Sequence, residues 1–304
     1  MMLTQDKYGK LRRWLVFLSV SFLALVGLAL ALLVPPVWTL KDGPISILRW
    51  PKSGAQVFTV GPGQETWVPI QRVSRHVLNA IVVAEDARFY EHPGLDWHEI
   101  KMSFEHNIEQ KRYARGASTI TQQVVKMAFL GAEKNMLRKV REALGALVLE
   151  RILTKDQILE WYINLVEFGD GVFGIKAAAA HFFQTSAELL TIQDGAHLAL
   201  VLPSPNRWSK GLRQRELTDF GHRRYAQIIE EMYKLGFITA TLRQSALATG
   251  DFGRPIEGYQ SGADPHDVAG DVYVDLPGAE PPPFGHQTRP KRIKSEQQAT
   301  KRDP

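Results

Sequence analysis

An uncharged apolar segment near the N-terminus constrains this chain more than any other feature. It runs from Trp14 to Val34, and only two serines and one glycine interrupt it. As a helix rising about 1.5 Å per residue, it would be about 30 Å long, which matches the hydrocarbon core of a bilayer. A cleavable signal peptide has a shorter apolar region followed by a small-residue cleavage site. The segment therefore predicts a transmembrane helix over residues 14–34, with a buried core helix of a soluble protein as the alternative.

The residues that flank this segment predict its orientation. Trp14 and Trp38 bracket it, as aromatic residues do at both membrane interfaces. Four basic residues and one acid precede it: Lys7, Lys10, Arg12, Arg13 and Asp6. Because cytoplasmic flanks carry an excess of Lys and Arg, residues 1–13 are expected in the cytoplasm. The rest of the chain is then expected on the other side of the membrane.

The remaining residues divide into three parts by composition. Residues 39–69 are rich in Gly, Pro and β-branched residues and predict a linker with one short strand. Residues 70–249 carry repeated helical apolar spacing, so a mainly α domain is expected. Residues 250–304 are rich in Pro, Gly and charge, and predict a disordered tail. Residues 96–115 mix apolar and basic side chains, which fits either a helix resting on a membrane or a solvated helix and loop.

Composition excludes some chemistry. The chain has no cysteine, so disulfides, thiolate catalysis and cysteine-based zinc sites are excluded. Lys and Arg number 37 against 32 Asp and Glu, a net charge of +5. This charge fits an anionic partner or a membrane surface without choosing between them.

An acid pair, Glu85-Asp86, directly follows the apolar run 77–84 and begins the stretch around which the chain is organised. Ionised carboxylates are rarely buried unpaired, so packing does not explain the pair. The alternative to a functional role for this acid pair is a solvated helix end, where acid pairs are common. The turn His92-Pro93-Gly94 closes the stretch and is expected to hold the helix end open.

Polar and basic residues in the next segments suggest a cleft that combines a general base with an anion clamp. Ser118 or Thr119 is expected to cap a helix, whose free N–H groups suit an anion. Arg138 and Glu142 are spaced for an ion pair on one helix face. The full constellation is Glu85, Ser118, Thr119, Gln123, Lys126, Arg138, Lys139 and Glu142.

These residues fall into five ordered motifs that resemble the peptidoglycan glycosyltransferases of family 51. The motifs are Glu-Asp-x-x-Phe-x-x-His-x-Gly at 85–94, Gly-x-Ser-Thr-Ile-Thr-Gln-Gln at 116–123, Arg-Lys-x-x-Glu at 138–142, the segment 158–174 and the segment 196–205. No Ser-x-x-Lys occurs, and little chain follows residue 210, so no transpeptidase domain is expected. The resemblance is therefore to the monofunctional biosynthetic transglycosylases of this family.

The resemblance implies a lysozyme-like, mainly α glycosyltransferase domain in the bacterial inner membrane. It implies lipid II as substrate and β-1,4 glycan as product, with partners in cell-wall synthesis or division and no nucleic acid. Glu85 is implied as general base, and Glu142 as a second catalytic residue that orients Lys126 or Arg138. The implied substrate-binding residues are Asp86, Ser118, Thr119, Gln123, Lys126, Arg138 and Lys139.

The resemblance leaves the role of metals open. A divalent cation, Mg or Mn, is expected to help bind the pyrophosphate, but no metal-ligand spacing in the sequence requires one. Met127 stands where the family commonly has Asn, and Asp194-Gly195 replaces the usual Glu-Ala. Neither departure touches Glu85, Lys126 or Glu142.

Two alternative functions compete with polymerisation. A lytic glycan hydrolase on the same fold would need a Glu with a raised pKa as general acid and a route for water. It would not need the cations Lys126, Arg138 and Lys139. The other alternative is an inactive, membrane-anchored scaffold for cell-wall assembly, against which the intact Glu85 argues.

Overall fold

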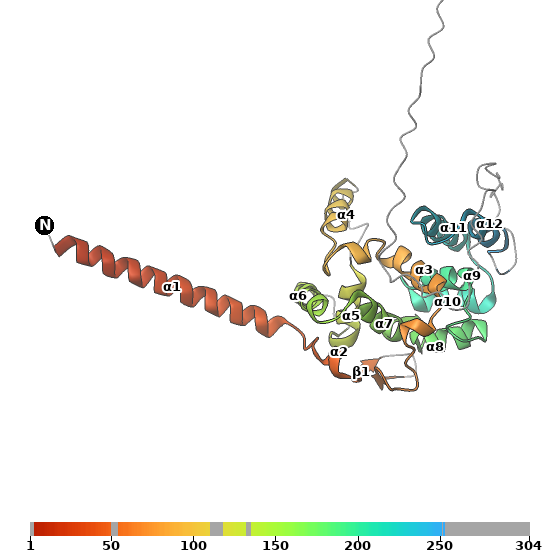
Figure 1. The fold of residues 1–304 in the computed structure, drawn as a ribbon, viewed down its shortest axis with the longest axis horizontal. Coiled ribbons are helices and arrows are strands. Elements are labelled where there is room, and N and C mark those ends of the chain that lie inside the picture. The colour runs from red at the N-terminus through yellow and green to blue at the C-terminus, as the bar shows by residue number, and fades with distance from the viewer. Residues whose placement is uncertain (1–2, 50–53, 110–117, 132–134, 251, 253–304) are drawn as a thin grey trace, which may run out of the picture. The chain divides into compact units, whose positions relative to one another are not determined.

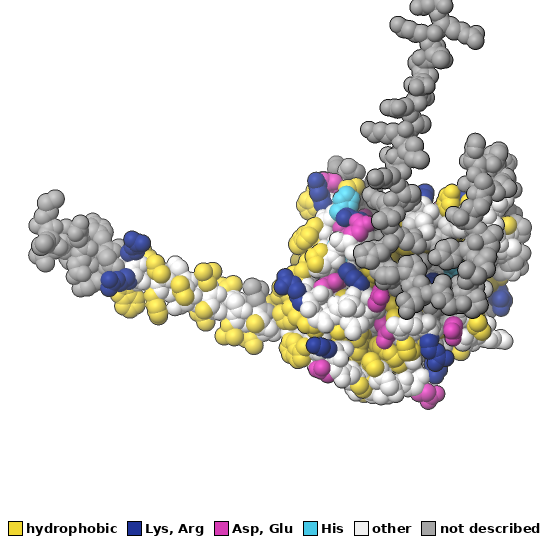
Figure 2. Space-filling model, in the orientation of Figure 1, with side chains coloured by type: hydrophobic (Ala, Val, Ile, Leu, Met, Phe, Trp, Pro, Cys, Tyr) yellow, Lys and Arg dark blue, Asp and Glu magenta, His cyan; other side chains and the backbone are white. Residues whose placement is uncertain are grey.

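The first element of the structure is a long apolar helix. This computed structural model describes residues 3–49, 54–109, 118–131, 135–250 and 252. Helix α1 (Leu3–Leu33) contains the segment Arg12–Leu33, which is long and apolar enough to cross a membrane. Its large apolar side chains are exposed, with basic side chains near its N-terminal end (Figures 1 and 2). The element agrees with the predicted transmembrane helix.

The remainder of the described chain is mainly helical, which confirms the expected fold class (Figure 1). Its short 3₁₀ and π segments are η1 (Ile70–Arg72), η2 (Phe89–Glu91) and η3 (Ala179–Phe183). The α-helices after α1 are α2 (Thr39–Asp42), α3 (Arg75–Glu85), α4 (Trp97–Glu109), α5 (Ile120–Phe129), α6 (Met136–Ile152), α7 (Lys155–Leu165), α8 (Gly174–Ala178), α9 (Ile192–Val201), α10 (Pro205–Gln214), α11 (Asp219–Lys234) and α12 (Ala240–Thr249).

Two close helix contacts place the elements that carry the polar motifs. Helix α3 packs against α9, and α11 packs against both. At the α3–α9 contact, a Cβ on Gly195 would lie 2.9 Å from the Val77 Cα, so only glycine fits without a shift. Helix α5 packs against α6 and α7, where a Cβ on Gly145 would lie 2.7 Å from a Val125 methyl. The departure to glycine at 195 thus suits the approach of α9 to α3.

Helix α7 anchors the segment that precedes α3. Asn164 accepts from the Val68 N–H at 2.8 Å and donates to the Val68 carbonyl at 2.9 Å. Both oxygens of Glu160 are also used: Oε2 accepts from the Ile70 N–H at 2.9 Å, and Oε1 from the Trp67 indole at 3.1 Å. These polar residues of the fourth motif therefore hold the fold together.

Two β-hairpins lie in regions where the sequence predicts a linker with one strand or a turn. The region 39–69, expected as a linker with one strand, contains an antiparallel pair, β1 (Ile45–Arg49) and β2 (Gln56–Val60), in which Ile45 faces Val60. The glycine-rich turn after α7 forms the short strands β3 (Glu167–Gly169) and β4 (Val172–Phe173). Gly171, at φ +75°, makes the tight turn between them.

Two helix predictions need correction. The apolar spacing of residues 187–202 predicts one helix that ends at 203–208, but α9 begins only at Ile192, because Thr191 caps it in a reciprocal capping box with Asp194. A further helix, α10, follows where the sequence predicts only this end. Pro205 starts α10 at a position where a missing N–H costs nothing. The predicted tail lies outside the described residues apart from Gly250 and Phe252, as does the basic segment 111–115.

Candidate active site

Glu85 is the last residue of α3, at the point where the helix leaves the core. Val77, Leu78 and Ile81 form the buried face that fixes this helix. Glu85 Oε2 accepts a hydrogen bond from the Gln123 side chain at 2.7 Å. Its other oxygen, Oε1, has no hydrogen-bond partner in the described part of the chain, and the residue keeps part of its surface exposed. The carboxylate is therefore held on one oxygen and available on the other.

Asp86, the second acid of the pair, is bound within the protein. Its Oδ2 accepts from the Ile120 N–H at 2.9 Å, and its Oδ1 lies 2.9 Å from His92 Nε2. Both residues are buried. Asp86 thus joins the end of α3 to the start of α5, and it also lines the cavity beside Glu85. The substrate contact predicted for Asp86 stays a prediction, with a supporting role for Glu85 as the alternative. His92 supports that link, as the turn interpretation expected.

Thr119 caps α5 and is also committed to the fold. Its hydroxyl donates to the Gly94 carbonyl at 2.6 Å and accepts from the Gln122 N–H at 3.2 Å. The Gln122 side chain completes the capping box. Gly94 adopts φ +98°, and a Cβ there would lie 3.0 Å from the Ala146 carbonyl oxygen. Thr119 therefore fixes α5 against the turn and also lines the cavity beside Glu85, so its predicted substrate contact stays a prediction.

The third motif forms an ion cluster on the first turns of α6. The buried Glu142 carboxylate binds the Arg138 guanidinium through Oε1 and the Lys139 ammonium, at 2.9 Å, through Oε2. Lys139 also donates to the Ser118 hydroxyl at 2.7 Å. Both oxygens of Glu142 are engaged, so this carboxylate orients the two cations, while its predicted catalytic role stays a prediction.

The ammonium of Lys126 differs from these cations because it has no hydrogen-bond or ion-pair partner among the described residues. Lys126 lies on α5, one turn after Gln123. Burial lowers the pKa of Lys126, while Glu142 and Glu85 raise it and Arg138 and Lys139 lower it. An ammonium held near carboxylates without a partner of its own is suited to an incoming anion.

The surroundings of Glu85 favour its proton-accepting chemistry. Burial raises the pKa of Glu85 above the ordinary glutamate value, and the neighbouring Asp86 adds to that rise. The Gln123 hydrogen bond and the positive charges of Arg224 and Lys126 act in the opposite direction. A carboxylate with a raised pKa is a stronger base toward a hydroxyl while it stays ionised at neutral pH.

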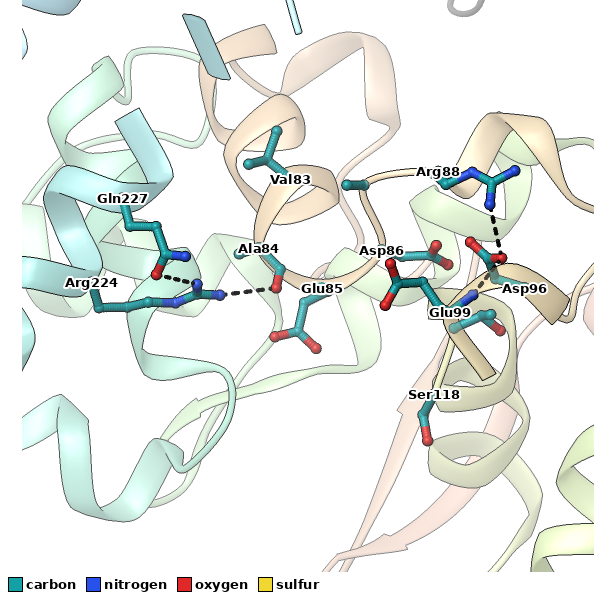
Figure 3. A pocket seen from close by; sticks show the side chains of 12 residues that line it. Val83, Ala84, Glu85, Asp86, Arg88, Asp96, Glu99, Ser118, Arg224 and Gln227 are labelled. Carbon is teal, nitrogen blue, oxygen red and sulfur yellow. Dashed lines mark hydrogen bonds and ion pairs between the residues drawn. The ribbon is translucent and has the colours of Figure 1, made fainter. Parts of the chain in front are cut away.

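A cavity of about 470 Å³ opens beside Glu85 (Figure 3). It reaches from Arg224 and Gln227 on α11, past the acid pair, to Ser118 beside the ion cluster. Arg224 donates to the Ala84 carbonyl at 3.1 Å, so a third region of sequence reaches the site. Sequence reasoning missed Arg224, because it lies beyond the five motifs and its contact spans 140 residues. Only its position two turns into an amphipathic helix was visible in the sequence.

The described residues contain one group suited to a metal ion. One ligating atom each of Asp86, His92 and Asp96 lie within 4.8 Å of one another. Asp86 and His92 bind each other, and Asp96 Oδ1 accepts from Arg88 at 3.2 Å and from two backbone N–H groups. Asp96 Oδ2 and His92 Nδ1 are buried without a hydrogen-bond partner among the described residues. At the anion clamp, Lys126 and the α6 cluster supply positive charge but no free carboxylate. The residues therefore do not fit a protein-held cation at the anion clamp.

Comparison with known proteins agrees with this geometry. A family model described as Transglycosylase matches residues 53–233, more than half of the chain. The chain belongs to the transglycosylase family. The match covers Glu85, the α5 and α6 motifs and Arg224, so all the side chains gathered at the cleft lie inside the family domain.

Several curated relatives of this transglycosylase carry the name biosynthetic peptidoglycan transglycosylase. The one from Dechloromonas aromatica is 38% identical over 222 residues, which is 67% of this chain and 93% of the relative. The one from Janthinobacterium is 35% identical over 205 residues, 64% of this chain and 85% of the relative. The one from Nitrosomonas europaea is 47% identical over 142 residues, 47% of this chain and 58% of the relative.

Proposed function

We propose that this transglycosylase polymerises lipid II into β-1,4 glycan strands, with Glu85 as the general base. The observation that carries the proposal is the state of the Glu85 carboxylate. One oxygen is fixed by Gln123 and the other is free beside a cavity. A sugar 4-hydroxyl is a poor nucleophile at neutral pH, and a positioned carboxylate can take its proton in the transition state.

The reaction is a direct displacement. The 4-hydroxyl oxygen bonds to the anomeric carbon as the bond from that carbon to the pyrophosphate oxygen breaks. The proton goes to Glu85, and the electron pair leaves with undecaprenyl pyrophosphate. Because no covalent intermediate forms, the α-linked donor gives a β-linked product.

The cations on α5 and α6 are assigned to the leaving group. Lys126 is uncommitted, and Arg138 and Lys139 are held in place by Glu142. Fixed cations stabilise the negative charge that develops on the departing pyrophosphate. Gln123 and Ser118 are assigned to positioning at the cleft between base and clamp. A divalent cation carried by the pyrophosphate itself fits this arrangement without protein ligands.

The apolar helix and the family together indicate a membrane-anchored enzyme, which suits a lipid-linked substrate. We place residues 1–13 in the cytoplasm and the catalytic domain outside the bacterial inner membrane. The basic flank of the helix supports this orientation. Proteins of cell-wall synthesis or division are the expected protein partners.

Glu85→Gln tests the proposal in the full-length purified protein with labelled lipid II. We expect polymer formation to fall by about a thousandfold, with an unchanged melting temperature, because the amide keeps the shape of the carboxylate. Glu231→Gln is the matched control, since Glu231 pairs with Lys234 on the surface of α11. A Glu85→Gln variant that polymerises at the wild-type rate would refute the base assignment.

The same assay separates the two alternatives. Release of soluble fragments from preformed glycan by the wild-type protein would favour a lytic hydrolase. No turnover of lipid II or glycan under any condition would favour an inactive scaffold. Growth of long strands from lipid II alone supports polymerisation.

A further inference from the structure

Arg224 on α11 reaches the catalytic end of α3 from a distant part of the chain. Its guanidinium nitrogen Nη2 donates to the Ala84 carbonyl at 3.1 Å, and Nη1 donates to the Gln227 side chain at 3.0 Å. Figure 3 shows Arg224 extended between Gln227 and Ala84, next to Glu85. Both α11 residues line the same cavity as Glu85.

The bond to Ala84 forms in the last turn of α3, where carbonyl groups lack partners within the helix. The last carbonyls of an α-helix have no partner within the helix, and they carry its partial negative charge. Ala84 directly precedes Glu85, which ends α3. A guanidinium bonded to this carbonyl therefore restrains the backbone from which the catalytic side chain projects.

Arg224 also contributes charge at the carboxylate. The groups that act on Glu85 are Arg224 from α11, Lys126 and Gln123 from α5, and its neighbour Asp86. Tyr162 of α7, a buried phenol, is also close enough for the charge on Glu85 to raise its own pKa. Lys126 is assigned to the leaving group, where it would be neutralised by substrate. Arg224 is then the cation that continues to favour ionised Glu85 while substrate is bound.

We propose that Arg224 is a positioning residue for the Glu85 base: through its bond to the Ala84 carbonyl it fixes the end of α3 from which the carboxylate projects. Gln227 orients the guanidinium for this role. The proposal rests on the proposed function of Glu85, and it extends the active site to α11. It also gives a role to a half-buried arginine that lines the cavity beside Glu85.

The test compares three variants at the two adjacent arginines of α11 in the full-length protein. Arg224→Gln removes both the positive charge and the guanidinium that bonds to Ala84 and Gln227. Arg224→Lys keeps the positive charge but not the guanidinium. Arg223→Gln removes an exposed charge one residue away. The rate of lipid II polymerisation is measured as kcat and as kcat/KM across pH, alongside the melting temperature. Glu85→Gln is run in the same assay, so that failure of the base assignment is seen separately.

We expect Arg224→Gln to lower kcat by about tenfold, since misplacing a catalytic group by a fraction of an ångström is costly. The acid limb of its pH–rate profile, where the rate falls as Glu85 is protonated, should move to higher pH. Loss of the positive charge raises the pKa of Glu85. Arg224→Lys should keep the acid limb near its wild-type position and recover part of kcat. Arg223→Gln should match the wild type in both.

Two outcomes would overturn the proposal while leaving Glu85 as the base. The first is Arg224→Gln with wild-type kcat and an unmoved acid limb. The second is a lower kcat with an unmoved limb and a melting temperature that falls in proportion, which would make Arg224 structural only.

Discussion

Helix α7 and the end of α3 both carry polar residues of the family motifs, but they use them differently. On α7, Glu160 and Asn164 satisfy their side-chain groups within the protein, chiefly on the segment 67–70. At the end of α3, Glu85 keeps one oxygen free, and the ammonium of Lys126 near it has no partner among the described residues. A motif residue that is fully paired holds the fold, whereas one left with a free group beside a cavity is available to substrate.

The same distinction separates residues inside the active site. Glu142, Asp86 and Thr119 lie among the catalytic motifs, yet their oxygens are engaged with protein groups. Like Glu160 and Asn164 on α7, these three residues hold parts of the fold together. Among the described residues, Glu85 keeps one carboxylate oxygen and Lys126 keeps its ammonium without a hydrogen-bond partner, beside the oriented cations of α6.

Two variants, Lys126→Ala and Asn164→Ala, test this comparison between the end of α3 and α7. Lys126→Ala is expected to have the larger effect, on lipid II turnover. We expect lipid II turnover to fall by about a hundredfold, because a fixed cation on the developing pyrophosphate charge is lost. The melting temperature should hardly change, since the Lys126 ammonium makes no hydrogen bond or ion pair with the described residues. Polymerisation assays and thermal unfolding measure the two quantities on the same preparation.

Lys234→Ala is the matched control for the loss of one ammonium group, because Lys234 pairs only with Glu231 at 3.1 Å on the surface of α11. It should leave both turnover and melting temperature unchanged. A Lys126→Ala protein that melts much earlier but turns over normally would place Lys126 with the structural residues of α7.

Asn164→Ala should show the opposite pattern, with a small effect on turnover. Three hydrogen bonds are lost, and the half-buried backbone N–H and carbonyl of Val68 lose their partner. We expect the free energy of unfolding to fall by about 2 kcal/mol, while turnover per folded molecule stays within about twofold. Denaturant unfolding measures the first quantity, and active-site titration corrects the second. A stable variant with severely reduced turnover would contradict the division.

Sequence predicted the parts of the site that are local. The spacing of apolar residues located the end of α3, and the spacing of Arg138 and Glu142 predicted their ion pair, because both depend on the geometry of a single helix. The cap at Thr119 followed from the same local rules.

Contacts between distant segments could not be predicted in this way. Arg224 meets Ala84 only because α11 packs on α3, and no local pattern encodes that contact. Likewise, the sequence presents Asp86 as a second free acid, whereas the folded chain brings Ile120 and His92 onto it. Helix α10 and the β1–β2 hairpin were missed because their Pro- and Gly-rich flanks resemble loops.

The dependence of kcat/KM on pH tests the central claim most directly. A general base must be ionised, and burial raises the pKa of Glu85 above its ordinary value of 4.5. The account predicts that wild-type polymerisation of lipid II falls tenfold per pH unit below a single pKa that lies above 4.5. A rate that rises as the pH falls through this range would show that Glu85 acts in its protonated form, as a hydrolase requires. A rate that holds steady would show that ionised Glu85 is not required, and either result would contradict the account.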